Sequence, residues 1–234
     1  AGALSVGIGF VSVMSRLLNP SALLPDSTSS EKQQLLEETD LGARLRHLVE
    51  ILARFTRALR ESSSVDQRSG VSSRFSIAGA ETIAAAALHR KVIRGEDDAV
   101  ARVVDLETAV DVLGGKVEFE VGEEGRESEL LTHLLRTAVA DTVRPLVRSI
   151  DFGPLVTAIE EGAEIATGEQ VSARDFLDGL PALGESRVYE ELFERLDAQT
   201  DGQRAAAAEL ALEGLYLARK VGKDSAGGET VYGQ

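Results

Sequence analysis

The spacing of the apolar residues most constrains the fold, because along most of the chain it follows the period of an α-helix. Between residues 41 and 61, apolar side chains recur three and four positions apart, as on one face of an amphipathic helix. These side chains are Leu41, Leu45, Leu48, Ile51, Leu52, Phe55 and Leu59. Thr39 or Asp40 can cap this helix, which should end near Glu61. The pattern predicts a helical domain starting near residue 40.

Similar patterns predict helices along the rest of the chain. The expected segments are 75–91, a short helix ending at Gly114 and Gly115, 123–147, 154–162, 172–180, 186–197 and 202–222. Pro145 should kink or end the predicted helix over 123–147 near its close. Only residues 116–121, KVEFEV, alternate apolar and charged side chains as a short half-buried strand does. We therefore expect an all-α or mainly helical fold.

The composition restricts the classes of function. The net charge of -14, from 25 basic and 39 acidic residues, disfavours binding to nucleic acid or to an anionic membrane. The chain has no cysteine, which excludes disulfides, thiolate metal sites and cysteine nucleophiles, and makes a cytoplasmic location the simplest reading. With no tryptophan and 4% aromatic residues, the core must consist of Leu, Val, Ile and Ala, which suits helix packing.

The N-terminal region has a different character. Its apolar run reaches Arg16 before the roughly 20 residues that a membrane-spanning helix needs, and it lacks the features of a secretory signal. We expect a short helix or strand there, with a membrane-associated segment as the alternative. Residues 19–30 are rich in Pro, Ser and Thr, as in a linker. The expected organisation is an N-terminal remnant with linker, then two helical domains and a flexible tail. These parts span residues 1–39, 40–115, 116–222 and 223–234.

Familiar catalytic and metal-binding patterns are missing from the sequence. No phosphate-cradling G-x-x-x-x-G-K-[ST] motif occurs, and the closest segment, LGGKVEF, has valine where the magnesium-binding hydroxyl is needed. His47, His89 and His133 fall on different predicted helices with no second ligand one turn away. Paired acids are explained by solvated helix faces. We expect no catalytic residue and no metal ligand in this chain.

Arg68 and Arg74 are the strongest candidates for a binding role. They flank a serine-rich turn at the start of a predicted helix, where the backbone N–H groups favour an anion. A guanidinium at such a place can bind phosphate oxygens through two hydrogen bonds. The alternative is that these arginines pair on the surface with Asp66 or Glu81.

A resemblance to a known family is carried by residues 45–90, LRHLVEILARFTRALRESSSVDQRSGVSSRFSIAGAETIAAAALHR. This stretch resembles the helical lid of the magnesium-chelatase-like, MoxR-related branch of the AAA+ ATPases. The segment SGVSSRFSIA matches the place of the sensor-2 motif, which aligns Arg74 with the sensor arginine and leaves Arg68 as a weaker candidate. Three further segments, GKVEFEVGEEGRE, ELALEGLYLARK and GGETVYG, resemble the C-terminal extension of actinobacterial-type members. Together the resemblance covers about Ala43 to the C-terminus.

The resemblance implies a function in which ATP hydrolysis is coupled to remodelling of a partner or to metal insertion by a chelatase. It implies ATP and Mg²⁺ as cofactors, with the main binding site outside this chain, because the family's Walker A, Walker B, sensor 1 and arginine finger have no counterpart here. The implied partners are the AAA+ core, neighbouring subunits of a ring oligomer and a protein with a von Willebrand factor A domain. The chain alone should therefore be inactive. The alternative is a non-enzymatic helical module that binds a protein partner.

Overall fold

The computed structural model of the chain describes residues 47–66, 68, 71, 73–226 and 229–234. The expected N-terminal segment and linker, and the capping residues Thr39 and Asp40, lie outside the described residues. No described helix is long and apolar enough to cross a membrane.

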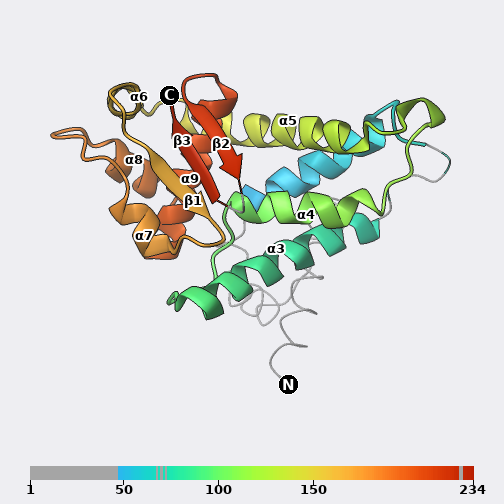
Figure 1. Cartoon of the computed structure of the whole chain (residues 1–234), viewed down its shortest axis with the longest axis horizontal. Coiled ribbons are helices and arrows are strands. Elements are labelled where there is room, and N and C mark those ends of the chain that lie inside the picture. Colours follow the sequence, from blue (N-terminus) through green and yellow to red (C-terminus); the bar gives the residue numbers. More distant parts are fainter. Residues whose placement is uncertain (1–46, 67, 69–70, 72, 227–228) are drawn as a thin grey trace, which may run out of the picture.

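The first half of the described chain is helical (Figure 1). Residues 47–61 form a helix, and α3 (Ser73–Arg94), α4 (Val104–Gly114) and α5 (Glu127–Val147) follow it. A short 3-10 turn, η2 (Val121–Glu123), precedes α5. Pro145 lies inside α5, and the helix ends two residues later, at Val147. These helices confirm the prediction of a mainly helical protein.

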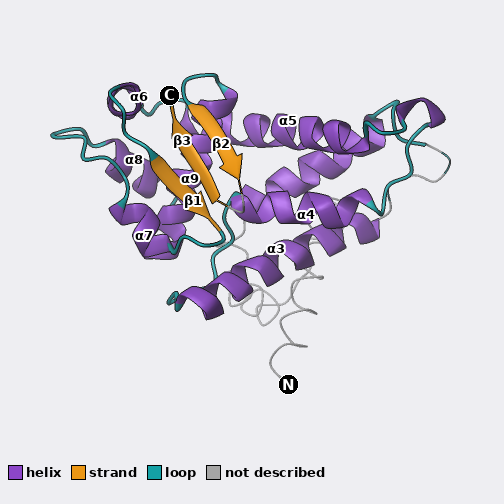
Figure 2. Cartoon of the chain, viewed as in Figure 1, coloured by secondary structure: helices purple, strands orange, loops and turns teal. Residues whose placement is uncertain are grey.

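The second half combines shorter helices with a small sheet (Figure 2). Its helices are α6 (Gly153–Glu160), α7 (Ala173–Asp178), α8 (Val188–Arg195) and α9 (Asp201–Leu217). Its strands are β1 (Ile165–Gly168), β2 (Gly222–Ala226) and β3 (Glu229–Gly233). The four helices coincide with predicted segments, whereas none of the three strands was predicted.

The tail over 223–234 is not a flexible end, which corrects the sequence-based expectation. β2 and β3 pair as an antiparallel hairpin, and β3 also pairs with β1, giving the strand order β1-β3-β2. Tyr232 lies opposite Ile165 on one side and Lys223 on the other. The alternation of β3 turns Thr230 and Tyr232 inward, where both are buried, so the hairpin is anchored to the core.

The predicted strand over 116–121 is also wrong. In this segment the structure has a single isolated bridge between Phe119 and Val65, and Val121 already belongs to η2. The partner segment is the short turn after the helix over 47–61. Among the described residues two backbone hydrogen bonds join the two segments, Asp66 to Glu118 and Glu120 to Ser64. Because the segment that pairs with residues 116–121 is so short, the pairing stops at one bridge and no strand forms.

Two hydrophobic clusters form the core, and α9 belongs to both. The first cluster joins the helix over 47–61, α3, α4 and α5, together with Leu210 of α9. The second joins α6, α7, α8 and the sheet to other α9 residues, including Ala208 and Leu212. The predicted boundary near residue 115 lies within the first cluster, because α5 is part of that cluster. Residues 207–213 of α9 are all buried, as expected of a central helix.

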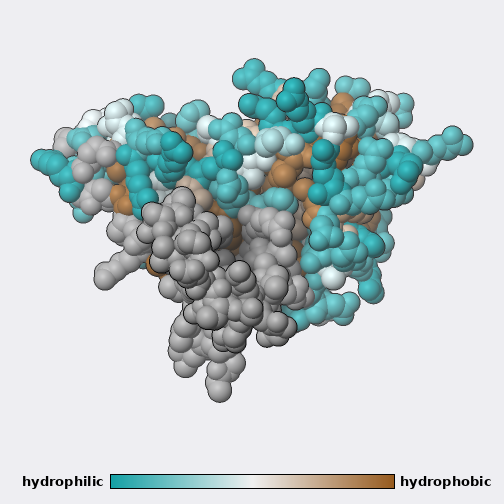
Figure 3. Space-filling view, turned by 180° about the vertical axis from the view of Figure 1, so that it is seen from behind, coloured by the Kyte–Doolittle hydropathy of each residue, from teal (hydrophilic) through white to brown (hydrophobic). Residues whose placement is uncertain are grey.

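One face of the molecule shows how polar and apolar side chains are distributed on the described surface. Seen from behind, the described surface is largely hydrophilic, with limited apolar stretches between polar side chains (Figure 3). This agrees with the high content of charged residues, 27% of the chain.

Candidate functional site

Arg68, the weaker of the two candidate arginines, pairs with a neighbouring acid. Its Nη2 and Nε donate to the two carboxylate oxygens of Asp66 at 3.0 and 3.1 Å, and its backbone N–H donates to the same group at 2.8 Å. The hydrogen bond and charge of Asp66 raise the pKa of Arg68. The side chain is 87% exposed, so this is a surface ion pair of the kind weighed as the alternative.

Arg74, the stronger candidate, occupies the first turn of α3. The helix starts at Ser73, and its first turn contains no acidic residue. The backbone N–H groups of a first turn have no partners within the helix and favour an anion. The position of the Arg74 side chain is outside what the structure describes.

The histidines belong to three different helices. His47 belongs to the helix over 47–61, His89 to α3 and His133 to α5. Across the described part of the chain, no group of three or more histidine or acidic side chains could hold a metal ion.

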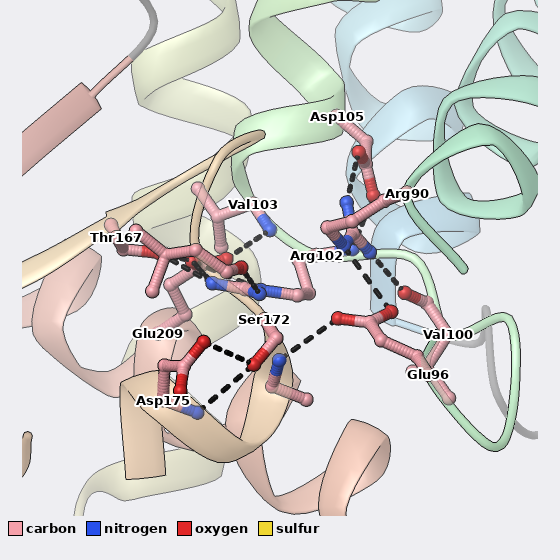
Figure 4. A network of polar contacts seen from close by, with 12 residues as sticks. Arg90, Glu96, Val100, Arg102, Val103, Asp105, Thr167, Ser172, Asp175 and Glu209 are labelled. Atoms are coloured by element: carbon pink, nitrogen blue, oxygen red, sulfur yellow. Dashed lines mark hydrogen bonds and ion pairs between the residues drawn. The ribbon is translucent and has the colours of Figure 1, made fainter. Parts of the chain in front are cut away.

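Arg102 lies at the centre of a buried polar network (Figure 4). Its side chain is 1% exposed, and its Nε and Nη2 donate to one oxygen of Glu209 at 3.2 and 2.7 Å. Nη1 donates to the carbonyl of Val171 at 2.9 Å, and Nη2 donates to the hydroxyl of Thr167 at 2.6 Å. The other oxygen of Glu209 accepts the backbone N–H of Val103 at 2.9 Å. The network joins the start of α4 to α9 and β1.

Arg90, near the end of α3, extends this network to α3 itself (Figure 4). Its Nη1 donates to Asp105 at 2.7 Å, and its Nε lies 3.6 Å from Glu96. The second oxygen of Asp105 accepts the backbone N–H of Arg102 at 2.7 Å. Glu96 in turn accepts the backbone N–H of Ala173 at the start of α7, at 2.8 Å. Charged groups thus connect α3, α4, α7 and α9 through the interior.

A second group of charges attaches the hairpin to α9. The ammonium of Lys223 donates to Glu213 at 3.0 Å and to Glu107 at 2.9 Å. The hydroxyl of Tyr232 donates to the same oxygen of Glu213 at 2.7 Å, and the Lys223 ammonium lies 5.7 Å from the centre of the Tyr232 ring. Glu213 therefore has two partners from the sheet and remains compensated although it is buried.

Burial and neighbouring charge oppose each other in setting the pKa of Glu209, whereas they act in the same direction on the pKa of Tyr232. Burial alone would raise the pKa of Glu209, but the charge and hydrogen bonds of Arg102, with the hydrogen bond from Thr167, outweigh burial and lower the pKa. Burial and the charge of Glu213 raise the pKa of Tyr232 well above its usual value. Glu209 is consequently ionised and Tyr232 protonated across the neutral range. Neither group is tuned for proton transfer near neutral pH.

The buried network is suited to hold elements together, because its groups are already bonded to one another. Every guanidinium nitrogen of Arg102 donates to a protein acceptor, and the side chain is 1% exposed, so the guanidinium is committed to the interior of the protein and not presented to a ligand at the surface. The sequence analysis missed this network. A signal was present: Glu209 and Glu213 lie four residues apart within the otherwise apolar run AAAAELALEGL, and Arg102 lies among valines and alanine. Charges placed in apolar runs indicate buried ion pairs.

Comparison with known proteins returned no match. No protein-family model, curated protein or solved structure matches this chain. The resemblance of residues 45–90 to an AAA+ lid therefore depends on the quoted motifs alone.

Proposed function

We propose that this chain carries the sensor-2 lid and C-terminal extension of a magnesium-chelatase-like, MoxR-related AAA+ ATPase. In this proposal the phosphate-cradling loop and the Mg²⁺ site belong to a core outside the given sequence. The chain contributes Arg74 to an ATP site completed by that core, in a cytoplasmic ring of subunits. Hydrolysis then drives remodelling of a partner, with a von Willebrand factor A domain protein as the partner implied by the family.

The observation that carries the proposal is the place of Arg74. The residue that matches the sensor arginine lies in the first turn of a long helix, and that turn contains no acid that would compete for the guanidinium or repel a phosphate. Arg68, by contrast, is already paired with Asp66. An arginine near the transferred phosphoryl group stabilises the charge that develops there.

The helix α3 connects the position of Arg74 with the buried network around Arg102. Arg74 lies at the start of α3 and Arg90 near its end, where Arg90 binds Asp105 in the buried network. In this proposal, a nucleotide that repositions α3 also repositions the elements tied to it through Asp105 and Arg102. ATP hydrolysis would in this way become movement of the C-terminal half.

The experiment combines this chain with an intact AAA+ core of the same family and measures ATP turnover. We expect no turnover from the chain alone, since it lacks the groups that cradle the β- and γ-phosphates. With the core, Arg74→Ala should lower turnover by a factor of about 10³ or more while leaving folding stability nearly unchanged. Arg74→Lys should recover only part, because an ammonium cannot bind with two parallel hydrogen bonds.

Arg68→Ala is the matched control, since Arg68 lies six residues before Arg74 in the same segment. It should change turnover much less. Small and equal effects of Arg68→Ala and Arg74→Ala would show that both are ordinary surface arginines. Turnover by the chain alone that a mutation within it abolishes would also contradict the proposal.

A further inference from the structure

A continuous groove runs between α4 and α5. It consists of two adjoining cavities of about 240 and about 590 Å³, which share Val110 and Ser128 in their walls. Figure 1 shows the two helices side by side, with β2 near one end and the connection over 115–126 near the other. We call this feature the α4–α5 groove. It exists because α4 packs more extensively against α3, and α5 against α9, than they pack against each other.

Apolar and polar side chains both line the α4–α5 groove. The apolar ones include Leu106 and Val110 of α4, and Leu131, Leu135 and Val139 of α5, which belong to the first hydrophobic cluster and are at most 9% exposed. Along each helix these residues follow each other at four-residue intervals, so they form one continuous stripe on each wall. Such a pair of stripes can receive the apolar face of a third helix.

The two ends of the groove differ in charge. Glu120, Glu124 and Glu127 line the end near η2; among the described residues none of the three forms a salt bridge, and Glu120 interacts with Arg68 only through its charge. Arg136 lies at the other end, and there its only recorded partner among described residues is the Tyr216 ring, 5.9 Å from its guanidinium carbon. Lys223 lies beside it but is neutralised by two glutamates. One end thus offers free negative charge and the other a free arginine.

We propose that the α4–α5 groove binds an amphipathic helical segment of a partner protein. The apolar side chains of that segment fill the groove, its lysines or arginines lie against Glu120, Glu124 and Glu127, and an acidic residue near its other end pairs with Arg136. The 11 residues of α4 span about 16 Å, so about three turns of helix fit along the groove. This inference stands apart from the proposed nucleotide function, since none of its residues is Arg74 or Arg68.

The shape and charge of the groove decide which kind of partner it fits. A nucleic acid is repelled by the acids at one end and by the net charge of the chain, -14. A small organic cation would use the acidic end alone and leave both the apolar walls and Arg136 without contacts. A basic amphipathic helix satisfies the apolar walls and both charged ends together.

The test uses a fluorescein-labelled probe peptide of about 12 residues, about 18 Å long as a helix. It carries leucines at helical spacing, two lysines near one end and a glutamate near the other, and fluorescence anisotropy measures its binding to the full chain. Ser128→Trp fills the middle of the groove from an exposed position, so it should weaken binding about tenfold or more without unfolding the protein. Circular dichroism checks that the variant is folded.

Charge reversal tests the polarity of the groove. The double variant Glu124→Lys, Glu127→Lys should weaken binding about tenfold, and a peptide with its charges reversed should regain affinity for it. Glu129→Lys is the matched control, because Glu129 lies on the same helix, is 81% exposed and is outside the groove. It should leave the affinity nearly unchanged.

Several outcomes would overturn the inference. One is a probe peptide that does not bind, or that binds Ser128→Trp as tightly as the unmodified chain. Another is an equal loss with Glu129→Lys, which would mean attraction by net charge alone. If Ser128→Trp instead changes the oligomeric state measured by analytical ultracentrifugation, the groove is occupied by a second copy of the chain.

Discussion

Glu209 can be charged in the interior only because Arg102 lies beside it. The side chains of Arg102 and Glu209 are each 1% exposed. Removing one of the two charges leaves the other buried without compensation. Glu209→Gln should therefore lower the free energy of unfolding by about 3–5 kcal/mol, measured by urea denaturation at neutral pH. The double variant Arg102→Met, Glu209→Leu should recover only part of this loss, because it leaves no unpaired charge but removes the hydrogen-bond partners of the Val103 N–H and the Val171 carbonyl.

Glu194 provides a control for that comparison. It pairs with Arg187 at 3.7 Å, but its side chain is 74% exposed. Glu194→Gln should change the free energy of unfolding by less than about 1 kcal/mol. A similar loss from both substitutions would mean that Glu209 stabilises the fold no more than a surface residue does.

The lowered pKa of Glu209 also predicts how stability depends on pH. A carboxyl whose pKa is lower in the folded than in the unfolded state contributes its full stabilisation above the unfolded value, near 4.5, and loses it as the pH falls through the folded value. The stability difference between the unmodified chain and Glu209→Gln should be constant above that range and shrink in acid. Urea midpoints measured over a pH series test this. A difference that already disappears at neutral pH would contradict the assigned direction of the shift.

At the scale of elements, the packing of α5 on α9 requires a residue without a side chain. A Cβ added to Gly214 of α9 would lie 2.5 Å from Cγ1 of Val143 on α5. In an exposed helix, Gly→Ala stabilises by about 1 kcal/mol, but here the clash should dominate. We expect Gly214→Ala to lower the free energy of unfolding by about 1–3 kcal/mol, measured by urea denaturation. Adding Val143→Ala should cost less in this background than in the unmodified chain.

The helices could be predicted because each one is specified by local spacing. Segments such as α5 and α8 show apolar residues at three- and four-residue intervals, which depend on nothing distant in the chain. The sheet could not be predicted in this way. β3 pairs with β1, and Ile165 and Tyr232 are 67 positions apart, the difference between 232 and 165. Short strands next to glycines gain their stability from such distant partners, so the local sequence suggested a frayed tail.

The candidate site was also predictable only where it depends on residues close together in the sequence. The helix over 75–91 was predicted from local spacing, with Arg74 just before its start, and α3 in fact begins two residues earlier, at Ser73, so that Arg74 lies in the first turn. The pairing of Arg102 with Glu209 joins residues 107 positions apart, and nothing near Arg102 identifies its partner. The sequence could have indicated a buried charge in α9, but not which cation compensates it.

At the scale of the whole molecule, α9 should make the two hydrophobic clusters unfold together. Leu210 packs in the first cluster, while Ala208 and Leu212 of the same helix pack in the second, and the Arg102 network joins both. All 3 tyrosines lie in or against the second cluster, so their signal reports on that half alone. Far-ultraviolet circular dichroism reports on helices in both halves. We expect the two signals to give coincident urea transitions.

A substitution deep in the first cluster makes this prediction sharper, because no tyrosine lies there. Leu59 is fully buried in the helix over 47–61, and Leu59→Ala should lower the free energy of unfolding by about 2–5 kcal/mol. If the clusters are one cooperative unit, the tyrosine transition must move to lower urea by the same amount as the helical signal. Leu88→Ala, at a position 55% exposed on α3, should move neither. A tyrosine transition that stays in place with Leu59→Ala would show that the two halves unfold independently and that the buried network does not couple them.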